Sequence, residues 1–130
     1  SSGGPLASTE FFSKLSFAVL YNLALAHHLN AQVTQQGSGL ARALTLYKTA
    51  YKIQMEGRYF TCLECMALLN NMGQIYKDFH DEKASRLCFE CLVSNVMLLR
   101  DRGWDLEEYS VFIANVVPLI LADSGSAGAA

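Results

Sequence analysis

The residues with the greatest capacity for chemistry are four cysteines, which form two CxxC pairs. Cys62 and Cys65 belong to the sequence CLEC, and Cys88 and Cys91 belong to the sequence CFEC. Two such pairs separated by 22 residues are close to the spacing of a zinc ribbon, and a single CxxC pair is typical of thioredoxin-like redox proteins. Whether either chemistry is available depends on the elements that carry the thiols.

The composition of the 130-residue chain predicts helices in a single domain. Ala, Leu, Met, Gln, Glu and Lys fill the long segments, only two prolines occur, and the alternation typical of strands is missing. The fold class is therefore expected to be all-α. Short, polar ends at residues 1–8 and 123–130 are expected to be flexible. The five expected helices cover about residues 9–30, 40–56, 59–78, 82–102 and 105–122.

Glycines and capping residues mark the expected helix ends. Gly57 and Gly103 are predicted to close helices, because a residue without Cβ adopts the left-handed conformation easily. The polar, glycine-containing stretch at residues 31–39 is expected to be a loop. Asp105 and Glu108 have the spacing of a capping box and indicate the start of the fifth helix.

The expected third and fourth helices must form an antiparallel hairpin, because the turn between them near His80 is short. Counted from that turn, Cys88 faces about residue 72, and Cys65 lies roughly 10 Å further along the axis. Four thiolates that each need about 2.3 Å to one zinc ion do not converge across that offset. Both pairs are expected in the middle of helices, away from the helix start that activates a redox thiolate. Core packing is the favoured interpretation, and a zinc or redox module is the alternative.

A degenerate internal repeat accompanies the predicted hairpins. The matching sets are Leu20, Leu23, Ala24 and His27 with Leu69, Met72, Gly73 and Tyr76, and Ala43 and Tyr47 with Ser85 and Phe89. This pattern resembles the tetratricopeptide repeat, in which small residues allow two helices to approach and an aromatic residue fills the space beside them. A weaker third copy is expected at residues 113–120. The resemblance implies a short TPR-like α-solenoid of stacked antiparallel hairpins over residues 9–122.

The copies are spaced more widely than in the family. The asparagines Asn22, Asn71 and Asn115, which recur with the pattern, are 49 and 44 residues apart, whereas the family repeat has about 34 residues. The additional residues are expected in the loop at 31–39 and in longer helices.

The resemblance also implies a concave groove, lined by the first helix of each hairpin, in which an extended peptide or a partner helix lies. The residues that it places in this groove are Tyr21, Asn22, Leu25, His28, Asn70, Asn71, Gln74 and Lys77. Amide side chains hydrogen-bond to a peptide backbone, and Lys77 would receive a carboxylate. The alternative is that Asn70 and Asn71 bond to neighbouring helices.

Composition and motifs argue against several classes of function. Hydrophobic residues make up 52% of the chain and charged residues 17%, and the net charge of −2 includes no basic run, so a nucleic-acid partner is not expected. No apolar run reaches the ~20 residues of a membrane span. His27 and His28 have no metal-binding partner at helical spacing, and catalytic motifs are missing. Neither a cofactor nor a metal nor an enzymatic activity is expected.

The sequence therefore predicts a protein-interaction scaffold or adaptor that binds a peptide or a partner protein in its groove. The alternative is a structural subunit of a larger assembly that packs through its terminal helices. A four-cysteine zinc module or a redox module is the third hypothesis. Cysteines that behave as small buried hydrophobic residues favour a reducing intracellular compartment, the cytoplasm or the nucleus.

Overall fold

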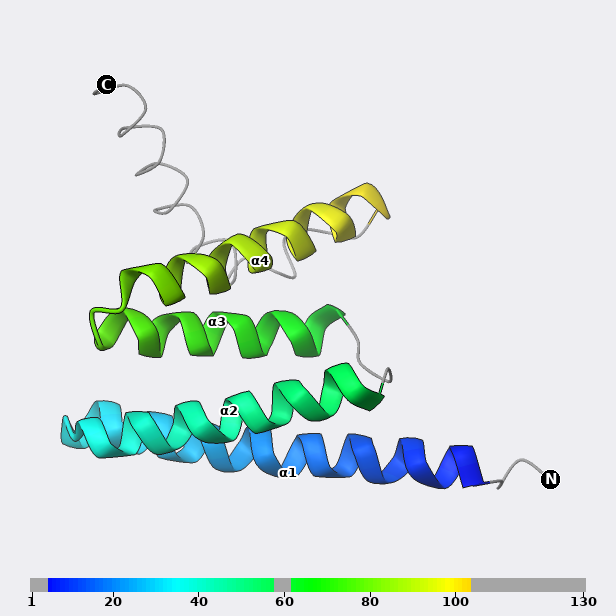
Figure 1. The fold of residues 1–130 in the computed structure, drawn as a ribbon, viewed down its shortest axis with the longest axis horizontal. Coiled ribbons are helices and arrows are strands. Elements are labelled where there is room, and N and C mark those ends of the chain that lie inside the picture. Colours follow the sequence, from blue (N-terminus) through cyan, green and yellow to red (C-terminus); the bar gives the residue numbers. More distant parts are fainter. Residues whose placement is uncertain (1–4, 58–61, 104–130) are drawn as a thin grey trace. The chain divides into compact units, whose positions relative to one another are not determined.

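The structure is a computed structural model that describes residues 5–57 and 62–103 (Figure 1). These residues contain helices and no strand, so the all-α prediction is confirmed for them. Residues 105–122, expected as a fifth helix, and the ends at 1–4 and 123–130 lie outside the described part. The helices are α1 (Pro5–Thr34), α2 (Gly37–Gly57), α3 (Cys62–Asp78) and α4 (Glu82–Asp101).

The chain divides into two compact units, which are described separately. Residues 1–68 form the first unit, with α1, α2 and the first turns of α3. The second unit begins at Leu69 and, among the described residues, contains the rest of α3 and α4. The first unit contains the small and aromatic pair Ala43 and Tyr47, and the second contains the pair Ser85 and Phe89. The stacking of hairpins into a solenoid stays a prediction.

In the first unit, α1 and α2 lie side by side (Figure 1) and their connection is shorter than predicted. The expected loop at residues 31–39 is reduced to Gln35 and Gln36, because α1 continues to Thr34 and α2 begins at Gly37. Gln35 adopts a φ of 58°, in the left-handed region. The Gln36 N–H donates to the carbonyl of Ala31 at 3.3 Å, which closes α1 in the manner of a Schellman motif.

Gly39 has a packing role where α2 begins beside α1. A Cβ built on Gly39 would lie 2.9 Å from the Cβ of Ala31. The glycine therefore lets the start of α2 approach the end of α1, and it is a packing residue within a helix and not a loop residue. α1 is also longer at its start, at Pro5 instead of about residue 9, because the fixed φ of proline suits the first turn of a helix.

The core between α1 and α2 combines small and aromatic side chains. Ala24, Ala43 and Tyr47 are fully buried, as the repeat pattern predicted for these positions. The ring of Tyr21 lies 5.8 Å from that of Tyr47 and 5.7 Å from that of Phe17, measured between ring centroids. The small residues allow close approach of the helices, and the aromatic rings fill the space beside them.

In the second unit, α3 and α4 form the predicted antiparallel hairpin around His80 (Figure 1). His80 adopts a φ of 60°, and the Asp81 N–H donates to the Tyr76 carbonyl at 2.9 Å, which closes α3. The Asp81 carboxylate then accepts a hydrogen bond from the Ala84 N–H at 3.1 Å and caps the start of α4. Gly103, with a φ of 80°, follows the end of α4 as predicted.

The contact between α3 and α4 centres on Gly73. The Ser85 hydroxyl donates to the Gly73 carbonyl oxygen at 2.9 Å, and both residues are buried. The ring of Phe89 lies directly over Gly73, where a Cβ would be 2.8 Å from the Phe89 Cζ. The packing that the sequence predicted for these three residues is therefore present in this unit.

Candidate interaction surface

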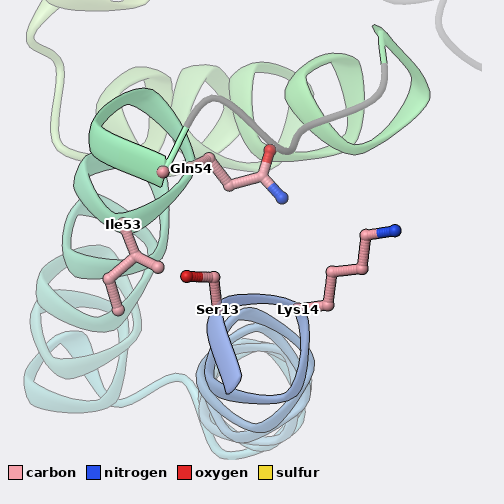
Figure 2. A pocket seen from close by; sticks show the side chains of 5 residues that line it. Ser13, Lys14, Ile53 and Gln54 are labelled. Atoms are coloured by element: carbon pink, nitrogen blue, oxygen red, sulfur yellow. The ribbon is translucent and has the colours of Figure 1, made fainter. Parts of the chain in front are cut away.

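A small hollow open to solvent lies between α1 and α2 in the first unit. Together with the open solvent at its mouth, it takes up about 200 Å³. Side chains from both helices reach it (Figure 2): it is lined by Ser13, Lys14, Ile53, Gln54 and Gly57. The Lys14 amine is already paired with the Glu10 carboxylate at 2.9 Å. The hydrogen bond to the Glu10 carboxylate, and then the negative charge of that carboxylate, raise the pKa of Lys14.

The buried amide of Gln54 has a structural role at the edge of this hollow. Its Nε2 donates to the Glu64 Oε2 at 2.8 Å, which joins α2 to the first turn of α3. Its Oε1 is buried and has no donor among the residues that the structure describes. The arrangement holds two helices together and presents no catalytic pair.

His28 is committed to the core of the first unit. The His28 Nδ1 and the Tyr47 hydroxyl are joined by a hydrogen bond of 3.2 Å, and the two rings meet edge to face with centroids 5.9 Å apart. The Gln32 amide nitrogen lies 3.4 Å from the His28 Nε2. Both ring nitrogens of His28 thus face protein groups, and the side chain is only 3% exposed.

The eight residues predicted to line a groove differ in their accessibility and fall in both units. His28 and Asn70 are buried, Tyr21, Leu25, Asn71 and Gln74 are half-buried, and Asn22 and Lys77 are exposed. The Asn70 amide donates a hydrogen bond to the Asn71 side-chain oxygen at 3.1 Å. Four of the eight residues belong to the first unit and four to the second, so the groove itself stays a prediction.

The cysteines differ in their positions on the helices and in their surroundings. Cys62 is the first residue of α3 that the structure describes, so the first CxxC pair lies in the first described turn of that helix. Cys88 and Cys91 lie within α4, where the helix dipole does not activate a thiolate. Cys65 is a reduced, buried thiol, whereas Cys91 is reduced and exposed. Among the described side chains, no group of three potential metal ligands from His, Cys, Asp and Glu comes together.

The most unusual surface in the first unit is the side of α1 that faces away from α2. Seven residues recur there at alternating intervals of three and four, and every one is exposed. We call this set the outer seam. Its members are Phe12, Leu15, Val19, Asn22, Ala26, Leu29 and Val33. Phe11 and Leu23 flank it and are 62% and 47% exposed.

The outer seam is the second of two apolar seams on the same helix. Phe17, Ala24 and Ala31, seven residues apart, are buried on the side of α2. Residues five apart, such as Phe12 and Phe17, are separated by about 140° around a helix, so the two seams lie on nearly opposite sides of α1. A helix that is apolar on both sides is typical of a helix packed from both sides.

The alternating spacing of the outer seam is that of a coiled-coil core. Apolar residues at alternating intervals of three and four give the period of 3.5 with which helices pair along their length. Here the spacing persists over 22 residues, from Phe12 to Val33, with Asn22 as its only polar member. The repeat pattern selects Asn22 for the predicted groove and does not mark the other members of the outer seam.

Comparisons with known proteins add no assignment for this surface: no protein-family model, no curated protein and no solved structure matches the chain. Within the described residues, none of the helices has the length and apolar character needed to cross a membrane. The function is therefore inferred from the geometry of α1.

Proposed function

We propose that this chain is a protein-interaction module and that its principal binding surface is the outer seam of α1. The observation that carries the proposal is the exposure of large apolar side chains along one helix. Val33 is 84% exposed and Val19 is 57% exposed, and Phe11 and Phe12 are each 62% exposed. Contiguous apolar surface of this extent is typical of an interface, because it is costly to leave in water.

Electrostatics also favour an apolar protein partner. Over its 30 residues, α1 carries only two charged side chains, Glu10 and Lys14, and these pair with each other. Neither belongs to the outer seam. A surface without net charge has no attraction for a phosphate backbone, whereas the apolar face of a second helix matches its chemistry and its length.

The sequence predicted binding in a groove, and the outer seam is a different surface from the predicted one. Only Asn22 belongs to both sets. Two of the predicted groove residues, His28 and Asn70, are buried in the described structure, whereas every member of the outer seam is accessible. A binding surface must be accessible to its partner. For this reason we prefer the outer seam to the predicted groove as the binding surface.

Affinity capture from the native source tests the proposal. The tagged wild-type chain is compared with Val19→Lys, which places a charge in the seam, and with Thr49→Lys, which places the same charge on the exposed surface of α2. We expect the wild type and Thr49→Lys to retain the same partner chains, and Val19→Lys to lose them. Circular dichroism checks that both variants remain helical. Retention of all partners by Val19→Lys would show that the seam is not the binding surface.

A further inference from the structure

We infer that the occupant of the outer seam is a second copy of this chain, so that two α1 helices pack along their seams with Asn22 opposite Asn22. This inference rests on the proposed function and names its partner. Four observations lead to it: the exposed area, the heptad spacing, the position of Asn22 and the lack of charge.

The exposed area is sufficient for a stable dimer. A Phe side chain offers roughly 200 Å² to solvent, and a Leu or Val side chain offers less. The exposed fractions of the seven large apolar residues on this side then amount to on the order of 700 Å² per chain, close to the roughly 800 Å² that each partner contributes to a standard interface. This exceeds the roughly 300–600 Å² of the largest apolar patch on a typical monomer. The seven are Phe11, Phe12, Leu15, Val19, Leu23, Leu29 and Val33.

The heptad spacing specifies the shape of the occupant. A seam with a 3.5-residue period on a helix is complementary to another helix that carries the same period, because each side chain then fits between four of the partner. Among the helices that the structure describes, α1 itself has this property over its whole exposed side. A second α1 is therefore a fitting partner, and its seam extends over the same 22 residues.

Asn22 is the fourth of the seven seam residues and lies at the middle of the seam. When two seams run parallel with Asn22 facing Asn22, they overlap along their full length. An amide buried in an apolar interface needs a hydrogen-bonding partner, and a second amide supplies both a donor and an acceptor. A single asparagine in such a core is a known means of fixing the register and number of helices.

Opposite charges at residue 22 provide a test that is specific for a second copy. In Asn22→Asp or Asn22→Lys alone, two like charges would face each other in an apolar interface, which raises the dissociation constant of the dimer by on the order of 100-fold or more. When the two variants are mixed, an aspartate faces a lysine. The mixture therefore regains the dimer, whereas a different partner protein would leave it dissociated. Because Asn22 is exposed within one chain, neither change disturbs the fold of the monomer.

The experiment is sedimentation equilibrium on the purified full chain at concentrations up to about 0.5 mM, which detects even weak self-association. We expect twice the 14.3 kDa chain mass for the wild type and for the control variants Thr45→Asp and Thr45→Lys on exposed α2 surface, and the single chain mass for each Asn22 variant alone. We expect the equimolar mixture of the Asn22 variants to return to twice the chain mass.

Three results would overturn the inference: a monomeric wild type, dimers of each Asn22 variant alone, or a mixture that stays monomeric. The proposed function fails separately. If the wild type is monomeric and Val19→Lys loses the captured partner chains, the outer seam binds another protein and only the dimer inference fails. If the wild type is monomeric and Val19→Lys captures the same partner chains, the dimer inference and the proposed function both fail.

Discussion

The aromatic ring of Phe89 on α4 lies against the backbone of Gly73 on α3 in the described hairpin. A Cβ at Gly73 would be 2.8 Å from the Phe89 Cζ and 3.0 Å from its Cε1, closer than packed carbon atoms approach each other. Gly73 is thus required for its small size and not for an unusual backbone conformation. The position of Phe89 over this glycine sets the spacing of the two helices.

Replacing Gly73 by alanine is expected to lower the free energy of unfolding by up to about 2 kcal/mol. Overpacking of a core costs about 1–3 kcal/mol, and the better helix propensity of alanine offsets about 1 kcal/mol of it. Urea unfolding followed by circular dichroism measures the change. Gly37→Ala is the matched control, because a Cβ at Gly37 meets nothing within 4 Å. The control is expected to change stability by less than about 0.5 kcal/mol. Equal stability of the two variants would contradict the close contact.

The buried hydrogen bond from the Ser85 hydroxyl to the Gly73 carbonyl is expected to stabilise the same hairpin. Ser85→Ala should lower the free energy of unfolding by about 0.5–1.5 kcal/mol. Ser94→Ala is the control on the same helix, since the Ser94 hydroxyl donates to the Glu90 carbonyl at 3.1 Å on an exposed surface. That change should stay within about 0.5 kcal/mol of the wild type. If Ser94→Ala lost as much stability as Ser85→Ala, burial of the bond would have no consequence.

The left-handed backbone of His80 predicts a stabilising substitution. An L-residue pays roughly 1–2 kcal/mol in this conformation, and the greater freedom of glycine in the unfolded chain offsets part of the gain. His80→Gly should therefore raise the free energy of unfolding by about 0.5–1 kcal/mol. His80→Ala removes the same imidazole but keeps the Cβ, and it should give no such gain. Thermal and urea unfolding of both variants provide the comparison. Equal effects of glycine and alanine would mean that the φ of 60° carries no strain.

The burial of Cys65 and the exposure of Cys91 predict different thiol reactivities in the folded protein. Iodoacetamide should modify Cys91 before Cys65, because access and thiolate character control alkylation. Peptide mass spectrometry of a time course at neutral pH measures the order of modification. In urea, where the fold is lost, the two rates should become similar. Equally fast reaction of Cys65 in the native state would contradict its place in the core.

Sequence patterns predicted the helices well, and they failed where tertiary contact outweighs local preference. Gly103 and the turn at His80 follow directly from the residue types and the short connection. The segment at residues 31–39 has the composition of a loop, yet most of it is helical. Gly39 is needed there for its contact with Ala31, and a contact between two helices is invisible in the local composition of either one.

The outer seam was less predictable than the core, because the sequence does not state which apolar side of a helix is covered. Leu20 and Leu23 were matched to the repeat together, but Leu20 is half-buried while Leu23 is 47% exposed. The alternating spacing from Phe12 to Val33 was present in the sequence as a second apolar period. Only the position of α2 on the opposite side of α1 identifies that period as the uncovered one.

Photo-crosslinking within the assembled complex tests the central claim, that the outer seam of α1 contacts a partner chain. A benzophenone amino acid is placed either at Val19, in the seam, or at Arg42, on the exposed surface of α2, and each protein is irradiated in its native cellular setting. The account predicts a covalent adduct to a partner chain from position 19 and little or none from position 42. Adducts from position 42 with none from position 19 would contradict it.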